Sequence, residues 1–351
     1  EDYCMALKVI KVAIVGITGY SGLELLRLLK NHRYVEIVSI HNTANHSQMI
    51  SETYPHLKGM YKITTTPFDP LHIMQEADIV FFATSSGVSK DLVAPFIAAH
   101  FPVIDLSGDF RLSAEDYASW YHKTPAPQTL IDQTTYSLAD FYSASTTNYI
   151  ANPGCYATAT LLALAPLAQH HLLDKHNIII DAKSGLSGAG KSLTTASHFI
   201  NANENVTMYK ANQHQHIPEI TRQLQKWQPN IEHIQFNTSL IPINRGIFIS
   251  AYVKLNEDTS LDVLHRLYTS TYYQKPFIRV MPEGTLPNIK QVVGTNFADI
   301  GLAYNQDTKY LTIVSVIDNM IKGAAGQAIQ NMNHLFGFDE TMGLELIAQY
   351  A

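Results

Sequence analysis

A strand-like run that ends in a glycine-rich loop, near the start of the chain, constrains the fold more than any other feature. Residues 8–16, KVIKVAIVG, are rich in β-branched side chains and stop at Gly16. Residues 21–32, SGLELLRLLKNH, place leucines at helical spacing, and residues 35–42, VEIVSIHN, resemble a second buried strand. Buried strands of parallel sheets read as such apolar runs. The order strand, helix, strand therefore predicts a βαβ unit.

The alternation continues to about residue 150. Strand-like runs at 77–84 and 101–108 flank a helical pattern over 89–100. Strands that alternate with helices form doubly wound parallel sheets with helices on both faces. We therefore predict an α/β fold in which residues 1–150 form a Rossmann-type domain.

The pattern changes after residue 150. Long β-rich segments at 176–185, 234–255 and 310–318 surround a helical segment at 260–273. This arrangement predicts an α+β domain over residues 151–318 with a mostly antiparallel sheet. A helix rich in small residues begins near residue 319, and we expect residues 319–351 to pack back onto the first domain.

Composition excludes several classes of protein. The 351 residues are 46% hydrophobic and 15% charged, with a formal net charge of −6, which is typical of a globular protein. The chain has no basic run for a nucleic acid and no apolar stretch of roughly 20 residues for a membrane span. Two cysteines make no disulfide framework, so we expect a cytoplasmic protein.

The loop after the first strand predicts a dinucleotide site. Gly16, Gly19 and Gly22 stand between a strand and a helix, with Thr18, Tyr20 and Ser21 among them. Glycines allow the backbone to approach a pyrophosphate, and the N-terminus of the helix supplies N–H donors. The alternative is that the glycines only form a tight turn.

The end of the second strand indicates which dinucleotide binds. NAD sites often carry Asp or Glu there, whereas this strand ends in His41, Asn42 and Thr43. The absence of an acid favours NADP, with His41 and Thr43 near the 2′-phosphate. Ser85, in ATSSG at 83–87, either contacts the cofactor or belongs to a polar turn.

The stretch ANPGCYATAT at 151–160 places Cys155 where a helix is expected to begin. Asn-Pro-Gly cannot continue a helix, and the residues after it can form one, with a kink expected at Pro166. The helix dipole at this position stabilises a thiolate, which predicts a nucleophile. The alternative is a small buried core residue.

A nucleophilic cysteine needs an acid or base nearby. The stretch NQHQHIPEI at 212–220 offers His214 and His216, with Glu219 to orient an imidazole. These histidines could equally be surface residues, since the chain has 16 of them. Their spacing matches no common zinc site.

The stretch GLSGAGKS at 185–192 matches a phosphate-binding P-loop in full. That reading predicts a nucleotide triphosphatase or kinase, yet the motif lies in the β-rich domain rather than in the parallel sheet. The loop could instead place Lys191 near an anionic substrate. Arg111 and Arg245 could bind a carboxylate or phosphate, or form ordinary ion pairs.

Together these stretches resemble the N-acetyl-γ-glutamyl-phosphate reductase family, relatives of aspartate-semialdehyde dehydrogenase. The resemblance rests on GITGYSG, SGDFRL, NPGCYATA, SGLSGAGK, HQHIPEI, PINRGI and DNMIKGAAGQA, in the family's order along nearly the whole chain.

The resemblance implies NADPH-dependent reductive dephosphorylation of N-acetylglutamyl phosphate in arginine biosynthesis, through a thioester on Cys155. It implies His216 as acid/base, with His214 as the alternative, and Glu219 to orient the imidazole. Inorganic phosphate is released, and the enzyme forms a homotetramer or homodimer.

The resemblance also assigns residues to each ligand. The cofactor would contact the Gly16–Gly22 loop, and its nicotinamide end would meet Ser184, Gly185 and Asn319. The substrate would contact Arg111, Asn152, Lys191 and Arg245.

Three rival functions have their own tests. An aspartate-semialdehyde dehydrogenase would use a different acyl phosphate. A P-loop phosphotransferase would bind ATP without Cys155, and a dinucleotide sensor would have no reactive thiol.

Overall fold

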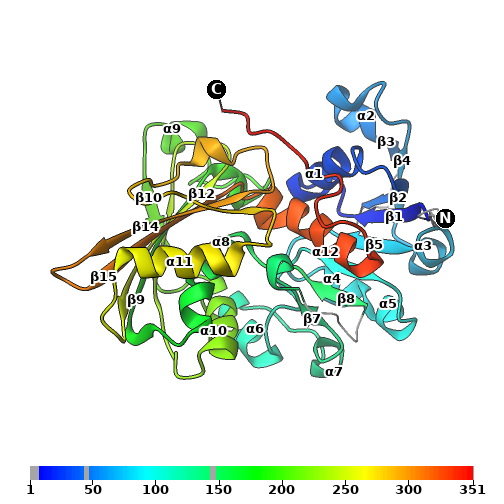
Figure 1. Ribbon diagram of the computed structural model, residues 1–351. Helices are drawn as coiled ribbons and strands as arrows, with labels where there is room; N and C mark the ends of the chain where they lie inside the picture. Colours follow the sequence, from blue (N-terminus) through cyan, green and yellow to red (C-terminus); the bar gives the residue numbers. More distant parts are fainter. Residues whose placement is uncertain (1–7, 43–46, 143–147, 351) are drawn as a thin grey trace, which may run out of the picture. The chain divides into compact units, whose positions relative to one another are not determined.

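The computed structural model describes residues 8–42, 47–142 and 148–350. Two compact units result (Figure 1). The first comprises the described residues up to Ala114, 124–152 and 328–344. The second comprises residues 115–123, 153–327 and the described residues from Glu345 onward. No helix among the described residues is long and apolar enough to cross a membrane.

An eight-stranded sheet forms the centre of the first unit, in the order β3-β4-β2-β1-β5-β6-β8-β7. All neighbouring strands are parallel except β3 and β4. The strands are β1 Ile10–Val15, β2 Val35–Asn42, β3 Gln48–Met49, β4 Thr64–Pro67, β5 Ile79–Phe82, β6 Val103–Asp105, β7 Thr135–Tyr136 and β8 Tyr149–Ala151.

Helices cover both faces of this sheet. Ala13 and Val15 of β1 pack in one apolar cluster with Ile73 of α3 and Phe96 of α5. Ile14 points to the other face and is also fully buried. The helical elements are α1 Tyr20–Leu29, α2 Ile50–Thr53, η1 Pro55–Leu57, α3 Pro70–Glu76, α4 Ser89–Leu92, α5 Ala94–Ala98, α7 Gln128–Ile131 and η2 Ala139–Phe141. The doubly wound Rossmann-type sheet is confirmed.

Residues near the C-terminus group with this first unit. Helix α12 spans Gly326–Phe336, and its residues from Ala328 onward belong here. Asn333 Oδ1 lies 2.9 Å from His32 Nε2, and Asn331 Oδ1 accepts a hydrogen bond from Ser137.

The second unit is built on a seven-stranded sheet, in the order β10-β11-β9-β12-β15-β14-β13. Four of its six strand pairs are antiparallel, and β11–β9 and β13–β14 are parallel. The strands are β9 Leu173–Ser184, β10 Thr207–Tyr209, β11 Gln235–Leu240, β12 Ile247–Leu255, β13 Ile278–Val280, β14 Ala298–Asn305 and β15 Tyr310–Ile317. The mostly antiparallel sheet is confirmed.

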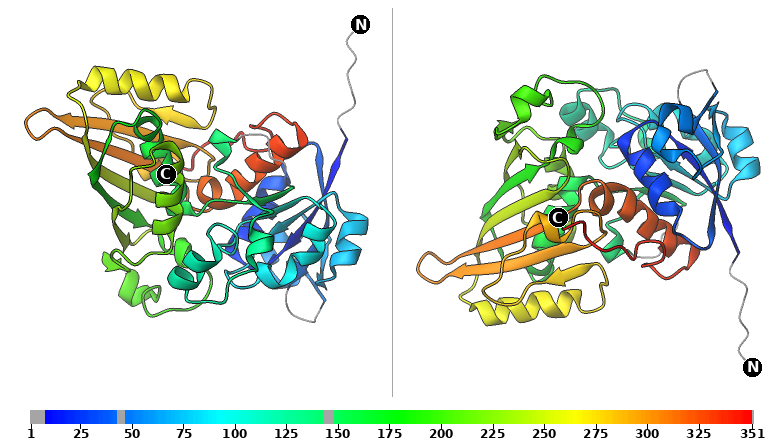
Figure 2. Two further views of the ribbon diagram at one scale, coloured as in Figure 1. Left: turned by 90° about the horizontal axis from the view of Figure 1, so that it is seen from below. Right: turned by 90° about the horizontal axis from the view of Figure 1, so that it is seen from above.

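Helix α8, Cys155–Gln169, is the central helix of this unit, and all residues from Tyr156 to Ala168 are buried. It contacts β12, β15, β9, α10 and α11, while α11 lies against β13 and β14 (Figure 2). The other helical elements are α6 Ala114–Tyr121, η3 Leu186–Ala189, α9 Phe199–Ala202, α10 His216–Trp227, α11 Leu261–Tyr272, η4 Ile289–Gln291 and a π-helical turn η5 Ile321–Ala325.

Helix α8 continues through Pro166 as one helix, and the kink expected at this residue stays a prediction. Proline has no N–H, so the carbonyl of Leu162, four residues earlier, loses its donor within the helix. The hydroxyl of Tyr272 donates to this carbonyl, and that of Tyr268 donates to the next, at Ala163. Two tyrosines of α11 thus hydrogen-bond to the part of α8 that the proline affects.

Candidate functional site

Cys155 is the first residue of α8, with Gly154 as an extended N-cap before it. The Cys155 thiol forms no disulfide with another described residue and is partly accessible, whereas the next 13 residues of the helix are buried. A partly exposed thiol at the N-terminus of a long helix is placed to act as a nucleophile.

Glu219 binds the backbone directly before this cysteine. Its buried carboxylate accepts a hydrogen bond of 2.8 Å from the N–H of Gly154. The sequence had suggested that Glu219 orients a histidine. The bond to Gly154 gives the carboxylate a further task, which is to fix the loop that presents Cys155.

The two histidines have different surroundings. His214 is buried among the rings of Tyr156, Tyr209 and Phe236. Burial, and then the nearby charges of His216 and Lys210, lower the pKa of His214 to about 2. Its Nδ1 accepts a hydrogen bond from the N–H of His216, so this ring is a neutral acceptor.

His216 is the first residue of α10, and its ring lies 4.6 Å from that of His214. Its ring centre is 6.0 Å from that of Tyr156, which directly follows Cys155. The structure thus brings both histidines and Glu219 to the start of α8 within the second unit.

Two tyrosines that the sequence analysis did not select join this cluster. The hydroxyl groups of Tyr156 and Tyr209 lie 3.1 Å apart. Burial raises the pKa of Tyr209 to about 12, with the nearby Cys155 raising it further and the bond to Tyr156 lowering it. Burial likewise raises the pKa of Tyr156. In the sequence, the only indication that a tyrosine belongs to this cluster was the position of Tyr156 directly after Cys155.

Three loops of the second unit meet at Asn319. Its Oδ1 accepts from Gly246 N–H at 2.8 Å, and its Nδ2 donates to Ser187 Oγ at 3.0 Å. Ser184 is buried and Gly185 has no room for a side chain, since a Cβ there would come within 2.7 Å of the Asn244 carbonyl. Asn319 therefore joins the loops after β9, before β12 and after β15.

Arg245 lies in the second of these loops. Its guanidinium is 3.6 Å from the carboxylate of Asp318, which is fully buried and also accepts from the N–H groups of Gly294 and Met320. One third of the Arg245 side chain is exposed, so it can meet an anion while it balances this carboxylate.

The P-loop interpretation of GLSGAGKS does not agree with the structure. Gly185 directly follows β9, a strand of the mixed sheet, and a short 3-10 turn spans Leu186–Ala189. The next helix, α9, begins only at Phe199 and has four residues. A P-loop needs a helix that starts at its Lys-Ser pair, because the N–H groups there bind phosphate. Lys191 is exposed beyond the turn.

The glycine loop of the first unit fits a dinucleotide. Gly16 has φ +90°, and a Cβ on Gly22 would come within 2.5 Å of the Gly16 carbonyl. Gly19 is the N-cap of α1, with Tyr20 and Ser21 in the first turn and Thr18 half-buried before them. The strand, the tight turn and the open start of the helix are the arrangement that binds a pyrophosphate.

The residues that the sequence predicted near the ribose and its 2′-phosphate do not all face a ligand. His41 is fully buried, with Nε2 3.0 Å from Ser39 Oγ and Nδ1 3.2 Å from the Pro67 carbonyl. Both ring nitrogens are therefore engaged inside the unit, and His41 supports the strand end rather than offering a donor to a 2′-phosphate. Ser85 is exposed after β5. Thr43 lies outside the described residues.

Arg111 and Asn152 are also structural. Arg111 is buried and donates to the carbonyls of Asn152 and Leu106 at 2.8 and 2.7 Å. The fully buried side chain of Asn152 accepts from Asn331. These contacts fix the backbone just before Pro153, so direct substrate binding by either side chain is not what the geometry favours.

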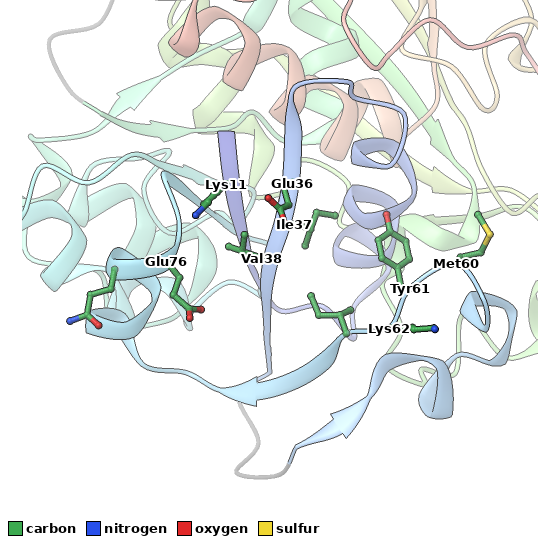
Figure 3. A pocket seen from close by; sticks show the side chains of 10 residues that line it. Lys11, Glu36, Ile37, Val38, Met60, Tyr61, Lys62 and Glu76 are labelled. Atoms are coloured by element: carbon green, nitrogen blue, oxygen red, sulfur yellow. The ribbon is translucent and has the colours of Figure 1, made fainter. Parts of the chain in front are cut away.

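A separate hollow of about 570 Å³ lies at the opposite ends of the first unit's strands (Figure 3). Lys11 and Glu36 at the starts of β1 and β2 line it, with Tyr61 and Glu76. The glycine loop follows the other end of β1, so the hollow does not belong to the candidate site. Among the described residues, no cluster of His, Cys, Asp or Glu could hold a metal ion.

Two family models match the chain. The semialdehyde dehydrogenase NAD-binding domain matches residues 11–149, and the semialdehyde dehydrogenase dimerisation domain matches residues 155–319. The chain belongs to the semialdehyde dehydrogenase family. The second match begins at Cys155 and ends at Asn319, the residue at which three loops of the second unit meet.

The similar curated proteins share one name. The chain is 52% identical over 323 residues to N-acetyl-gamma-glutamyl-phosphate reductase of Streptococcus mutans, covering 92% of this chain and 94% of that protein. It is 53% identical over 317 residues to the reductase of Lactococcus lactis, covering 90% and 92%. The chain is therefore an N-acetyl-gamma-glutamyl-phosphate reductase-type member of the family.

Solved structures agree on the fold. Aspartate semialdehyde dehydrogenase II of Vibrio cholerae, complexed with ASA, aligns with a TM-score of 0.68 at 17% identity, covering 93% of this chain and 98% of that one. Aspartate semialdehyde dehydrogenase of Candida albicans, solved with NADP, gives a TM-score of 0.63 at 14% identity, covering 92% and 97%.

Proposed function

We propose that this chain catalyses the NADPH-dependent reductive dephosphorylation of N-acetyl-γ-glutamyl phosphate to N-acetylglutamate semialdehyde, a step of arginine biosynthesis. One observation carries the proposal. Cys155 opens α8 beside a buried carboxylate and two histidines, in a chain about half identical to named reductases of this substrate.

The first chemical step belongs to Cys155. Its thiolate attacks the acyl carbon of the substrate, the carbon–sulfur bond forms, and inorganic phosphate leaves with the electrons of the carbon–oxygen bond. N–H groups of the first turn of α8 stabilise the oxyanion. The N–H of Gly154 is not among these groups, because it already donates a hydrogen bond to the carboxylate of Glu219.

The second step reduces the thioester. NADPH, when bound, would supply the hydride for reduction of the thioester carbonyl. The tetrahedral species then collapses to the aldehyde, and the electrons of the carbon–sulfur bond return to Cys155 as thiolate. The Gly16–Gly22 loop would hold the cofactor, and Ser184, Gly185 and Asn319 are the proposed contacts of its nicotinamide end.

His216 is the proposed acid/base. With a pKa of about 2, His214 does not become an imidazolium near neutral pH, and its Nδ1 accepts a hydrogen bond from the N–H of His216. His214 therefore positions the start of α10, and His216 moves the proton at the tetrahedral stages.

Arg245 and Lys191 are the proposed anion-binding residues. Arg245 is partly exposed and Lys191 is exposed, whereas Arg111 is buried and donates to two backbone carbonyls. We assign Arg111 and Asn152 a positioning role, in which they hold the backbone that leads to Cys155.

We further propose a cytoplasmic enzyme that forms a homodimer or homotetramer, with residues 1–150 as the cofactor domain and 151–318 as the catalytic domain. A family model described as a dimerisation domain supports self-association through the second unit. Ile179 and Tyr252 are exposed on the sheet face opposite to α8, because their neighbours in sequence are buried. A partly apolar open sheet face is suited to subunit contact.

The reverse reaction tests the proposal. We expect the wild type to reduce NADP in the presence of N-acetylglutamate semialdehyde and inorganic phosphate, and Cys155→Ser to lower kcat by about 10³-fold or more. Turnover of aspartate semialdehyde instead would keep the mechanism and replace the substrate. Turnover that survives Cys155→Ser would disprove the thioester.

A further inference from the structure

Two aspartates of the first unit are completely buried, and the reaction proposed above uses neither of them. Asp105 is the last residue of β6, and Asp109 lies in the loop that follows this strand. Ser89, the first residue of α4, lies between them, with its Oγ 2.7 Å from Asp105 Oδ2 and 3.1 Å from Asp109 Oδ2. Burial of two carboxyl groups is costly, so their hydrogen bonds show what the pair does.

Asp109 holds the segment that follows β5. Its Oδ1 accepts a hydrogen bond of 2.6 Å from the N–H of Gly87, and its Oδ2 accepts one of 3.2 Å from the N–H of Lys90. The N–H of Gly108 donates to Ser86 Oγ at 3.2 Å, which joins the same two loops a second time. The loop after β6 therefore fixes the position of residues 86–90.

The segment after β5 lies beside the glycine loop of the first unit. Strands β1 and β5 are parallel neighbours, so the loops that follow them leave the sheet at the same edge. A Cβ on Gly16 would come within 2.6 Å of the Ala83 carbonyl and 3.1 Å of Thr84 Cγ2. A dinucleotide at the glycine loop would therefore lie next to a segment that Asp109 holds in place.

The contacts around Ser89 need one proton more than the hydroxyl groups supply. Ser89 Oγ contacts Asp105, Asp109 and Ser107 Oγ, the last at 2.9 Å, and the Tyr149 hydroxyl contacts Asp105 at 2.8 Å. These are four contacts between oxygen atoms, whereas Ser89, Ser107 and Tyr149 carry one hydroxyl proton each. The fourth contact has a hydrogen only if one of the two carboxyl groups is protonated.

Asp105 is the carboxyl group that holds this proton. Burial raises the pKa of Asp105 and the charge of Asp109 raises it further, while the hydrogen bonds from Ser89, Ser107 and Tyr149 lower it. A protonated Asp105 donates to Ser89 Oγ, which also accepts from Ser107 and donates in turn to Asp109. Each of the four contacts then has its hydrogen, and Asp109 stays a carboxylate.

The charged groups around the pair agree with a single negative charge. Lys90, next to Ser89 in α4, binds Asp91 through its Nζ at 2.7 Å. Arg111 follows Asp109 in the same loop and donates to two backbone carbonyls. With one proton on Asp105, the buried pair carries one negative charge rather than two beside these residues.

We propose that Asp109 is a positioning residue for the dinucleotide, and that Asp105 is a neutral hydrogen-bond donor that supports it through Ser89. The pair holds residues 86–90 beside the glycine loop and so raises the affinity for NADPH, a consequence that rests on the proposed function. Neither side chain contacts the cofactor, because both are completely enclosed.

Two isosteric substitutions test the proposal, because the same change should have opposite results. In Asp105→Asn the amide N–H donates to Ser89 as the protonated carboxyl group does, so we expect the Kd of NADPH to stay within about threefold of the wild type. In Asp109→Asn an amide N–H would face the N–H of Gly87 or Lys90, so we expect the Kd to rise about tenfold or more. Fluorescence titration with NADPH, without substrate, measures the Kd.

Two further variants complete the series. Asp105→Ala removes the donor, and we expect it to raise the Kd about tenfold, so that the conservative Asn variant restores what Ala loses. Asp91→Asn is the matched control, because this carboxylate lies on the same short helix and is two thirds exposed. Its Kd should equal that of the wild type.

Each titration has a result that would overturn the proposal. If Asp105→Asn raises the Kd as much as Asp109→Asn does, Asp105 is an anion and holds no proton. If Asp109→Asn binds NADPH as tightly as the wild type, Asp109 does not position the dinucleotide. Far-UV circular dichroism shows whether Asp109→Asn is folded. If it is not, Ser89→Ala breaks the same link, and the same rise in Kd is expected from it.

The dependence of stability on pH tests the proton without any ligand. An aspartate of the unfolded chain loses its proton near about pH 4, whereas Asp105 of the folded chain keeps it to higher pH. The wild type therefore loses stability through this group as the pH rises above that value, and Asp105→Asn does not. We expect the urea midpoint of Asp105→Asn to rise relative to that of the wild type between pH 4.5 and pH 6.5. A constant difference would mean that Asp105 is ionised in the folded protein.

Failure of the proposed function would look different. A wild type that binds NADPH but does not reduce NADP with the semialdehyde would refute the proposed reaction, while the Kd series would still decide the role of Asp109. A wild type that does not bind NADPH would refute both the cofactor site and the positioning role.

Discussion

At the scale of single residues, the position of the nucleophile depends on contacts that lie beside it rather than on it. Glu219 is almost completely buried, and its carboxylate bonds to the backbone of Gly154, one residue before Cys155. A buried hydrogen bond to a charged group stabilises more than a neutral one, and loss of the acceptor leaves the N–H unsatisfied. The direction in which α8 presents its first residue therefore depends on this side chain.

Substitution of Glu219 tests this role. Glu219→Ala removes the acceptor, and we expect kcat to fall by about 10–100-fold and stability by about 1–3 kcal/mol. Glu219→Gln keeps an acceptor oxygen, so we expect its kcat to stay within about threefold of the wild type. Steady-state kinetics and urea unfolding measure both, and the rate at which iodoacetamide alkylates Cys155 reports the thiol. If Gln lowers kcat as far as Ala, the negative charge rather than the hydrogen bond is essential.

The buried histidines predict a dependence of stability on pH. Burial lowers the pKa of His214 to about 2, and burial also lowers the pKa values of His32 and His41. Above pH 6.5 these groups are neutral in both states, so they leave stability unchanged. Below pH 6.5 the unfolded chain takes up protons that the folded chain does not. For His214 the free energy of unfolding then falls by about 1.4 kcal/mol per pH unit, and His32 and His41 act in the same direction.

His214→Asn isolates one of these groups, because the amide oxygen can still accept from the N–H of His216. We expect the wild type to lose stability more steeply than the variant between pH 6.5 and 4.5, with a gap of about 1.4 kcal/mol at pH 5.5. Urea unfolding at a series of pH values measures the gap. Parallel curves would mean that His214 titrates normally.

The sequence predicted these residues unequally. The position of Cys155 at the start of a helix could be predicted from the sequence. Asn-Pro-Gly cannot continue a helix, and the small residues that follow it can form one. The bond from Gly154 to Glu219 joins residues 65 positions apart, and no local pattern encodes it. His41 shows the opposite error, since a polar residue at a strand end turned out to be enclosed by Ser39 and Pro67.

At the scale of elements, the start of α8 is packed against the π-helical turn η5. Gly323 N–H bonds to the Asp318 carbonyl, five residues back, which is the pattern of this turn. A Cβ on Gly323 would come within 2.7 Å of the Cβ of Cys155. Turns of this kind are rare and often lie at functional sites. The turn therefore limits where the nucleophile can lie.

Gly323→Ala should displace Cys155. Real Cβ atoms do not approach this closely, so helix and turn must separate. We expect kcat to fall about tenfold or more and the alkylation rate of Cys155 to change. Ala324→Gly is the control, because it alters the same turn without adding an atom beside the cysteine. Should Gly323→Ala retain full activity, the turn is not a positioning element.

Element types were more predictable than their partners. The runs at 176–185 and 310–318 became β9 and β15, since β-branched residues with buried alternation favour strands. The parallel pairing of β11 with β9 was not predictable, because alternation is the same in parallel and antiparallel strands. The helix expected over 89–100 is divided into α4 and α5 around Val93, just before Pro95.

At the scale of the whole molecule, the proposed tasks are divided between the two units. The glycine loop that fits a dinucleotide belongs to the first unit, and Cys155 with its histidines belongs to the second. Each unit has its own sheet and its own buried core. Substitutions in the first unit should therefore change the affinity for the cofactor without changing the reactivity of the Cys155 thiol.

Two glycines of the loop allow that separation. A Cβ on Gly22 would lie 2.5 Å from the Gly16 carbonyl, so Gly22→Ala must distort the turn itself. A Cβ on Gly19 would have its nearest neighbour at 3.5 Å, so the protein alone has room for Gly19→Ala. A pyrophosphate at the N-terminus of α1 would not have that room, because backbone N–H groups must approach it closely.

We therefore expect both variants to raise the Kd of NADP about tenfold or more, while only Gly22→Ala lowers the melting temperature clearly. Gly19→Ala should cost less than about 1 kcal/mol, as a change at an N-cap without a side-chain bond. Neither variant should alter the alkylation rate of Cys155. Fluorescence titration with NADPH, calorimetry and alkylation measure the three properties. A Gly19→Ala protein that binds NADP as tightly as the wild type would reduce the loop to a tight turn and move the cofactor elsewhere.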